Sequence, residues 1–325
     1  MTRPAESAGR WLERRGNAAP RGMTVILRKG RNRIPLTGLL HTFLFPAIFL
    51  LLAATAGPAA LAQATPVEEV PFVTTPQDVA EAMLDLAAVT AGDHLIDLGS
   101  GDGRIVIAAA RRGATALGVE NDPWLVQESI RKARDAGVSA RARFVEKDLF
   151  DADLSSASVV TLYLLPEVNL RLRPSLLALR PGTRVVSHDW DMGDWRPERS
   201  ITLTVPEKSV GLTKTSRVHL WVVPARVDGL WCGEGARGRG SLRLRQSFQQ
   251  LHGEAAIGDG TPVALSGQVD GERLALRPSS PATAGVWHLA VDGDGMRTRA
   301  ADGAWRTAAG LVWRRAATHG GCPAS

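Results

Sequence analysis

The sequence predicts an α/β protein with a doubly wound parallel sheet, followed by a small all-β unit. Between residues 75 and 223, apolar strand-like runs alternate with segments of helical periodicity, the pattern of parallel strands joined by crossover helices. After Pro224 the helical periodicity stops, and Asp-Gly pairs separate short apolar runs. A chain of 325 residues is long enough for two such units, each with its own core.

The first half of the predicted sheet is preceded by a helix. Thr75 is the expected N-cap, Pro76 lies in the first turn, and Asp78 is near the positive end of the helix. Gly92 and Asp93 end this helical pattern. The elements expected next are a strand at 94–98, a helix at 104–111, a strand at 115–120, a helix at 123–136 and a strand at 142–147.

The second half of the sheet is predicted from apolar runs further along the chain. Residues 159–164 and 184–188 are rich in β-branched side chains, as central strands buried on both faces are. A helix at 171–179 lies between them, with Pro174 within its first turn. Residues 201–205 and 218–223 follow with almost no helix between them, which predicts a closing hairpin.

The tail after Ala225 is predicted to be a sandwich or barrel of about 100 residues. Its Asp-Gly pairs, which are typical of tight hairpin turns, begin at positions 228, 259, 270, 292, 294 and 302. Its tryptophans are interpreted as core residues rather than a binding cage: Trp231, Trp287, Trp305 and Trp313. The expected division of the chain is therefore an N-terminal extension at 1–62, an α/β domain at 70–224 and a β-rich domain at 225–325.

Cys232 and Cys322 are the two cysteines of the chain, and both lie in the tail. In an exported protein they predict one disulfide that closes the ends of the tail, and the alternative is two unrelated free thiols. The seven histidines are scattered, and no Cys or His group has metal-ligand spacing. No metal is therefore expected.

A basic and then apolar leader accounts for the net charge of +6. Residues 1–62 carry 9 Lys/Arg and 2 Asp/Glu, whereas the remaining chain carries 30 and 31, so the body has no global field that attracts polyanions. Nucleic acid is therefore not expected as a partner. A basic cluster at 28–33, an apolar stretch at 34–52 and a small-residue run ending at Ala62 have the order of a secretory signal, with Met23 as a candidate start.

The apolar stretch has two interpretations, a cleaved signal peptide or an uncleaved membrane anchor. Both export the rest of the chain, because the basic end stays in the cytoplasm. The body is expected to be periplasmic, or membrane-anchored and facing outside the cytoplasm. A third interpretation is that the leader fails to export and the chain acts on the inner face.

The glycine-rich loop after the first predicted strand indicates a nucleotide-type site. A strand that ends in Asp-x-Gly-x-Gly-x-Gly and continues into a helix brings backbone N–H groups and the positive helix end to a crevice. Glu120 closes the next strand 23 residues after Asp97, near the offset at which a carboxylate binds ribose hydroxyls, and Asp148 closes the third strand. The candidate residues are Asp97, Gly99, Ser100, Gly101, Asp102, Gly103, Glu120 and Asp148.

The acidic residues distinguish between two nucleotide ligands. The dinucleotide fingerprint has a different third-glycine spacing, and Asp97 and Asp102 would repel a pyrophosphate. S-adenosyl-L-methionine instead carries a cationic ammonium and sulfonium, which carboxylates attract. We therefore interpret the loop as a site for S-adenosyl-L-methionine, and the fold as a Rossmann-like seven-strand methyltransferase sheet.

Four segments together resemble one family of seven-strand protein-lysine methyltransferases. They are PFVTTP at 71–76, DLGSGDGRIV at 97–106, VTLYLLP at 160–166 and VSHD at 186–189. The family comprises the mitochondrial enzymes that modify the ATP synthase c-subunit and the adenine nucleotide translocase, with archaeal and bacterial relatives. The resemblance covers about residues 70–224 and does not extend to the β-rich tail.

The resemblance implies roles for individual residues. By this resemblance Asp97, Gly99 and Gly101 hold the methionine part, Glu120 holds the ribose, and Asp148 with Leu149 forms the adenine edge. Residues 163–166 would line the acceptor channel after the fourth strand. The family often begins its first motif with Pro-Tyr, whereas this chain has Phe72, which puts the acceptor specificity in doubt.

Methyl transfer requires an amine lone pair aligned behind the sulfonium carbon, so positioning and desolvation supply most of the catalysis. A lysine ammonium must first lose a proton. We nominate Asp189 as the catalytic group, with His188 second, because both follow the fifth predicted strand, and we add Tyr163 at the end of the fourth. The alternative is that Ser187, His188 and Asp189 only cap the strand.

The expected function is methyl transfer to a lysine of a protein substrate, with a membrane protein among the expected partners. A small-molecule or lipid methyltransferase is the first alternative, favoured if the tail covers an apolar acceptor pocket. The second is a cofactor-binding protein without turnover, because S-adenosyl-L-methionine is made in the cytoplasm and the body is expected outside it.

Overall fold

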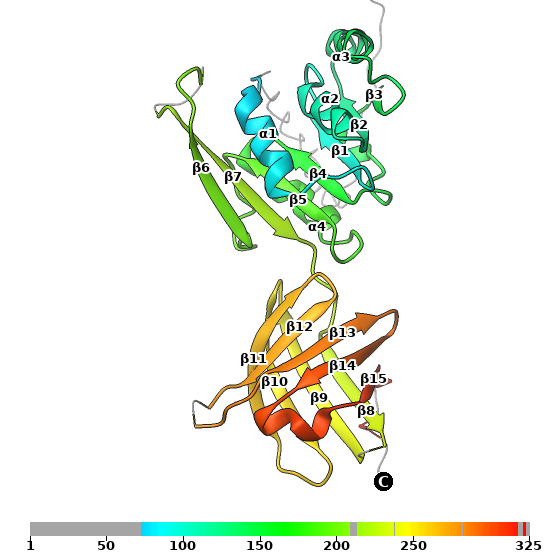
Figure 1. The fold of residues 1–325 in the computed structure, drawn as a ribbon, viewed down its shortest axis with the longest axis vertical. Coiled ribbons are helices and arrows are strands. Elements are labelled where there is room, and N and C mark those ends of the chain that lie inside the picture. The colour runs from blue at the N-terminus through cyan, green and yellow to red at the C-terminus, as the bar shows by residue number, and fades with distance from the viewer. Residues whose placement is uncertain (1–72, 209–212, 237, 281, 318–320, 323–325) are drawn as a thin grey trace, which may run out of the picture. The chain divides into compact units, whose positions relative to one another are not determined.

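The computed structural model describes residues 73–208, 213–236, 238–280, 282–317 and 321–322 (Figure 1). The expected leader, whether signal peptide or anchor, lies outside these residues, as do Pro71 and Phe72 of the first motif. Within the described part of the chain, no helix has both the length and the apolar character needed to cross a membrane.

The α/β part is a seven-stranded sheet with the strand order β3-β2-β1-β4-β5-β7-β6. The strands are β1 (His94–Leu98), β2 (Thr115–Glu120), β3 (Ala142–Glu146), β4 (Val159–Leu162), β5 (Arg184–His188), β6 (Arg199–Thr204) and β7 (Thr215–Val222). The helices are α1 (Gln77–Leu86), α2 (Arg104–Arg111), α3 (Pro123–Asp135) and α4 (Pro166–Leu176), with a short 3-10 helix η1 (Leu149–Asp151). The first five strands are parallel, and β7 pairs antiparallel with β5 and β6. The predicted sheet and its closing hairpin are confirmed.

The strand order reverses beside β1, whose neighbours are β2 and β4. In this register Asp97 lies between Gly118 on β2 and Thr161 on β4. Ligands of open α/β sheets bind outside the carboxyl ends of the strands at such a reversal. The topology therefore places the glycine-rich loop at the expected crevice.

The start of α1 differs from the prediction. Pro76, not Thr75, is the N-cap residue, and no side chain caps this helix end. Thr75 is buried instead: its Oγ1 lies 3.3 Å from His188 Nδ1, and its carbonyl accepts a hydrogen bond from Arg104. The hydroxyl that suggested a cap thus joins the start of α1 to the end of β5.

The predicted helix at 171–179 was placed too late in the sequence. Helix α4 begins at Pro166 and ends at Leu176, so Pro174 lies inside it rather than in its first turn. Proline is favoured at the first helical position because its fixed φ suits a helix and its missing N–H would be unpaired there. Residues 163–166 were expected to line the acceptor channel, so Pro166 was not interpreted as a helix start.

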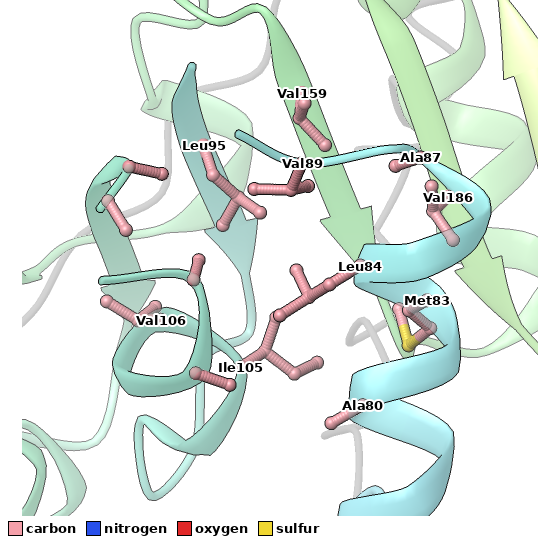
Figure 2. Close-up of a cluster of buried hydrophobic side chains, with 14 of the residues drawn as sticks. Ala80, Met83, Leu84, Ala87, Val89, Leu95, Ile105, Val106, Val159 and Val186 are labelled. Atoms are coloured by element: carbon pink, nitrogen blue, oxygen red, sulfur yellow. The ribbon is translucent and has the colours of Figure 1, made fainter. Parts of the chain in front are cut away.

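Apolar side chains pack on both faces of the sheet. Figure 2 shows one face, where Leu84 of α1 lies beside Ile105 of α2, in one cluster with Met83 of α1 and Leu95 of β1. Helix α1 has helical spacing of its buried residues, so it presents one apolar stripe to this core. Packing of α1 and α2 against the strands holds the loop between β1 and α2 in place.

The β-rich part is a closed barrel of eight strands in the order β10-β11-β12-β13-β14-β15-β8-β9 (Figure 1). Its strands are β8 (Gly229–Gly235), β9 (Gly238–Ser247), β10 (Gln250–Ile257), β11 (Val263–Asp270), β12 (Arg273–Pro278), β13 (Trp287–Asp292), β14 (Gly295–Ala301) and β15 (Val312–Arg315), with a 3-10 helix η2 (Gly303–Ala308). Adjacent strands are antiparallel throughout. Closure removes the exposed strand edges that an open sheet would present.

The barrel core contains the four tryptophans of the prediction. Trp231, Trp287, Trp305 and Trp313 are each at most 2% exposed. The Trp287 ring stacks on Trp305 and meets the edge of Trp313. Cys232 and Cys322 form the predicted disulfide, with their Cα atoms 5.4 Å apart. The interpretation of the tryptophans as core is confirmed.

Candidate active site

The glycine-rich loop joins the carboxyl end of β1 to the start of α2. Gly99, Gly101 and Gly103 all have positive φ, a conformation that side-chain-bearing residues rarely adopt. A Cβ on Gly103 would lie 2.7 Å from the Phe144 ring and 2.9 Å from Ser129 Cβ. The glycine repeat is therefore required both by the loop conformation and by the close approach of β3 and α3.

A cavity of about 690 Å³ opens beside this loop. Its lining includes all but one of the predicted cofactor residues: Asp97, Gly99, Ser100, Gly101, Asp102, Glu120, Asp148 and Leu149. The exception is Gly103, which is the N-cap of α2. The structure thus brings residues from three strand ends and the loop to one site, which we call the first cavity.

Asp97 lies at the centre of this arrangement and is only 2% exposed. Its Oδ1 accepts a 2.7 Å hydrogen bond from Thr161 Oγ1 on β4. Burial raises the pKa of Asp97 to about 8, against the Thr161 hydrogen bond, and the negative charges of Glu120 and Asp102 add to the increase. A cation bound beside Asp97 would favour its ionised form and replace the solvation that burial removes.

Glu120 is held by backbone N–H groups at the end of β2. Its Oε2 accepts from Gly101 at 2.8 Å, and its Oε1 accepts from Asn121 at 2.9 Å and from Asp122 at 3.1 Å. These bonds fix the orientation of the carboxylate toward the first cavity, which it lines. Because Oε2 accepts only the Gly101 bond among the described residues, its second lone pair is available for a hydroxyl donor. This geometry suits the ribose role that the sequence predicts.

Asp102 lines the first cavity, but its carboxylate is already paired. Arg104 Nη2 lies 2.7 Å and Lys132 Nζ 2.8 Å from Asp102 Oδ2. Burial opposes ionisation of Asp102, but the hydrogen bonds and charges of these two cations outweigh it and lower the pKa to about 2. Asp102 therefore ties the loop to α2 and α3, a contact that the sequence did not predict.

The far end of the first cavity is formed by the segment after β3. Asp148 Oδ1 accepts the Phe150 N–H at 2.9 Å and caps η1, which places Leu149 and Phe150 in the lining. The Arg171 guanidinium carbon lies 3.6 Å from the Phe150 ring centroid. No sequence pattern connects Arg171 on α4 with Phe150, so this pair was missed.

A second cavity, of about 260 Å³, adjoins the first. Val73, Thr74, Arg104 and Tyr163 line both cavities. The remaining lining residues of the second cavity are Pro76, Gln77, Asp78, Glu207 and Lys208. Tyr163 follows β4, where the sequence predicts the acceptor channel.

The three predicted catalytic residues form one cluster. The Tyr163 ring stacks on His188, with centroids 3.9 Å apart, and His188 Nε2 lies 3.5 Å from Asp189 Oδ2. His188 is fully buried, with Thr75 and Ser216 hydroxyls at its two ring nitrogens. Burial lowers the pKa of His188 to about 4. Of the three, Tyr163 lines the cavities, whereas His188 and Asp189 lie behind it.

Lys208 completes this cluster and was not found from the sequence. Its Nζ donates to Asp189 Oδ2 at 2.6 Å and to the Thr215 carbonyl at 2.7 Å. The Arg217 N–H donates to Asp189 Oδ1 at 2.9 Å, so both carboxylate oxygens have a donor. The connection between β6 and β7 carries Lys208 to this place, and no local motif marks it.

Known proteins match the α/β part. The family description "ANTKMT methyltransferase domain" matches residues 97–199. A protein-lysine N-methyltransferase from Saccharolobus islandicus (strain REY15A) is 43% identical over 138 residues, which are 42% of this chain and 86% of that protein. The chain belongs to the protein-lysine N-methyltransferases.

This methyltransferase also resembles a mammalian enzyme and a solved structure. The human lysine N-methyltransferase of the ATP synthase c-subunit is 37% identical over 129 residues, 39% of this chain and 55% of that protein. The chain thus spans about half the length of that relative. The crystal structure of an RNA methyltransferase from Salinibacter ruber in complex with S-adenosyl-L-homocysteine is 50% identical, covers 48% of this chain and 96% of that chain, and has a TM-score of 0.44.

S-adenosyl-L-methionine is the cofactor of this methyltransferase, and the first cavity has the residues to hold it. Asp97 offers a buried carboxyl for the ammonium, and Glu120 offers an oriented carboxylate for the ribose. Gly99, which also lines this cavity, packs closely against Leu164, because a Cβ there would lie 2.8 Å from Leu164 Cδ2. These carboxylates suit a cationic nucleoside rather than a phosphate.

Proposed function

We propose that this methyltransferase modifies a lysine side chain of a protein, and that this lysine enters through the second cavity. The observation that carries the proposal is that the two cavities meet at Tyr163 and Thr74. A methyl acceptor must reach the cofactor from a side that the cofactor does not fill. The second cavity provides that route and has room for one extended side chain.

The charges around the second cavity favour a cation. Arg104 is paired with Asp102, and Lys208 with Asp189. Asp78 and Glu207 also line this cavity, and neither side chain has a hydrogen bond or ion pair within the described part of the chain. The unpaired charges are therefore negative, which attracts a lysine ammonium and opposes a phosphate.

Bound S-adenosyl-L-methionine supplies a methyl carbon that carries a good leaving group, so the protein has to align and deprotonate the amine. The junction at Tyr163 removes the acceptor from bulk water, which lowers the pKa of an amine by desolvation. The Tyr163 hydroxyl has no hydrogen-bond partner within the described residues, and it is free to accept one from the acceptor amine.

The roles of the three catalytic candidates follow from their positions. We assign contact with the amine to Tyr163, which is half-buried at the junction. We assign support of the Tyr163 ring to His188, because its burial and its low pKa keep it neutral. Asp189, whose oxygens are occupied by Lys208 and Arg217, acts behind this pair rather than as the first proton acceptor.

We further propose that the enzyme works outside the cytoplasm. The disulfide between Cys232 and Cys322 supports this location, because such bonds persist mainly in oxidising compartments. The basic and apolar leader supports it independently. Fractionation of cells that express the full chain tests it: recovery in the cytoplasm with reduced cysteines would contradict the proposal.

The acceptor class is tested by incubating the purified full-length chain with methyl-labelled S-adenosyl-L-methionine and three separate fractions: membrane proteins, total RNA and lipids. We expect label in the protein fraction. The variant Asp97→Asn is the matched control, because it preserves the size of the side chain but removes the carboxylate at the cofactor ammonium. It should lose transfer to protein together with cofactor affinity.

The other fractions supply the contradicting results. Label that enters RNA but not protein would indicate that the acceptor is a nucleobase and not a lysine. Label in lipid would indicate the lipid methyltransferase that the sequence left open. Tight cofactor binding with no transfer to any fraction would indicate a binding protein without turnover.

A further inference from the structure

Lys208 is a buried cation that lines the second cavity, where the proposed reaction also needs the amine of the acceptor lysine. Its side chain is 10% exposed, and its partner Asp189 is 17% exposed. Breaking such a pair on one side leaves an uncompensated charge in a poorly solvated place. Lys208 also donates to the Thr215 carbonyl, so the start of β7 holds its ammonium in place.

Asp189 has an unusual backbone conformation, and its carboxylate is held in one orientation. Its φ is +62°, in the left-handed region, which costs about 1 kcal/mol or more for a residue with a side chain. The Arg217 N–H on one oxygen and Lys208 on the other hold the carboxylate behind His188. The negative charge of Asp189 is thereby fixed next to the His188–Tyr163 stack.

The charge of this carboxylate matters at the junction of the cavities. An uncompensated anion beside a bound lysine would stabilise the ammonium and delay its deprotonation. It would also draw a proton to His188 and make the phenol of Tyr163 harder to ionise. The groups that face Tyr163 and the second cavity are Asp78 on α1, Arg104 on α2, His188 and Asp189 at the end of β5, and Glu207 and Lys208 before β7.

We propose that Lys208 is a positioning residue of the acceptor site: it neutralises and orients Asp189, which keeps His188 neutral behind Tyr163 and favours the neutral amine of the incoming lysine. This role rests on the proposed function, because it requires an amine acceptor in the second cavity. Lys208 itself receives no methyl group in this scheme.

The chain offers a direct readout, because Tyr163 is its sole tyrosine. Ring-labelled tyrosine therefore gives NMR signals from one residue, and their pH titration reports the charge behind the phenol. In Lys208→Met the anion of Asp189 is uncompensated, so the Tyr163 midpoint should rise by about one pH unit. In Asp189→Asn the cation remains alone, so the midpoint should fall by a similar amount. The double variant should return near the wild type.

Methyl transfer supplies the second readout. The pH profile of label transfer to the membrane-protein fraction should move upward by about one unit in Lys208→Met, which lowers the rate about tenfold at pH 7 and restores it at higher pH. Lys208→Arg should recover most of the rate because it retains the charge. Arg131→Met, which removes an exposed cation on α3, is the control and should change neither readout.

The outcomes separate this inference from the proposed function. If Lys208→Met and Asp189→Asn move the Tyr163 titration in the same direction, or do not move it, the coupling is refuted. Asparagine has nearly the shape of aspartate, so Asp189→Asn still tests the coupling if Lys208→Met misfolds. In that case a Tyr163 midpoint that does not fall in Asp189→Asn refutes the coupling. Label transfer with an identical pH profile in all variants would refute the role of Lys208 alone. A wild-type chain that labels no protein would refute the proposed function, and the Lys208 role with it.

Discussion

Thr161 on β4 donates a 2.7 Å hydrogen bond to Asp97 on β1, across the two strands between which the sheet order reverses. Both side chains are buried. Burial makes the ionised form of Asp97 costly, and the Thr161 hydroxyl recovers part of that cost. The affinity of the site for a cationic ligand should therefore depend on how readily Asp97 gives up its proton.

The first prediction concerns the pH dependence of cofactor binding. The pKa of Asp97 is raised to about 8, so below that pH the carboxyl holds a proton that an ammonium ligand must displace. Affinity for S-adenosyl-L-homocysteine should rise between pH 6 and 8 by up to about tenfold per unit. Above about pH 8 Asp97 is already ionised in the free protein, so the rise should stop. Calorimetry measures this; a flat profile would show that Asp97 is already ionised at pH 6.

The second prediction isolates the Thr161 hydroxyl. Thr161→Val removes a hydrogen bond to a charged acceptor and leaves the side-chain shape, so the pKa of Asp97 should rise further and the binding profile should move up by about one pH unit. Affinity at pH 7 should fall about tenfold. Thr202→Val on edge strand β6, where the side chain is exposed, is the matched control. An equal effect of both variants would contradict the proposed coupling.

The third prediction compares two glycines with similar backbones. Gly103 and Gly137 have φ of +78° and +70°, but a Cβ would meet Phe144 at 2.7 Å in the first and nothing within 4 Å in the second. Gly137→Ala should lower the free energy of unfolding by about 1 kcal/mol, from backbone strain alone. Gly103→Ala should lower it by about 2 to 4 kcal/mol, because overpacking is added. Denaturant titration measures both, and equal losses would mean that the ring of Phe144 moves aside freely.

The sheet could be predicted from the sequence because each of its strands is a local apolar pattern. Strands at 94–98 and 115–120 have the predicted bounds, and the hairpin after β5 follows from the absence of a helix between its strands. The start of α4 was misplaced because residues 163–166 were interpreted as a channel lining after the fourth strand, whereas Pro166 is the first residue of the helix. Thr75 was assigned to a cap because a hydroxyl before a proline has that local meaning, whereas a tertiary partner, His188, determines its position.

The cofactor residues could be predicted for a similar reason. Asp97, Glu120 and Asp148 each lie at or just beyond the carboxyl end of a strand, and parallel strands end at one edge of the sheet. The partners that hold and tune them come from elsewhere in the chain. Lys132 reaches Asp102 from α3, and Lys208 reaches Asp189 from the connection before β7. Such pairs depend on how the elements pack, which a pattern along one strand does not encode.

The fourth prediction concerns the disulfide, whose cysteines are 90 residues apart in sequence. Replacing Cys232 and Cys322 by alanine should lower the stability of the barrel by about 2 to 4 kcal/mol, because the unfolded chain regains the freedom that the link removes. Affinity for S-adenosyl-L-homocysteine should stay unchanged, since the first cavity is lined by residues from the α/β part. Calorimetric unfolding with and without a reductant checks the first point. An unchanged transition in the double variant would contradict it.

The central claim is that the chain methylates protein lysine, and chemical identification of the methylated product tests it most directly. Protein labelled by the full-length chain is hydrolysed completely, and the labelled amino acid is separated and identified. We predict methylated lysine in the wild-type reaction and none with Asp97→Asn. Label recovered in another amino acid, or equal methyl-lysine with Asp97→Asn, would contradict it.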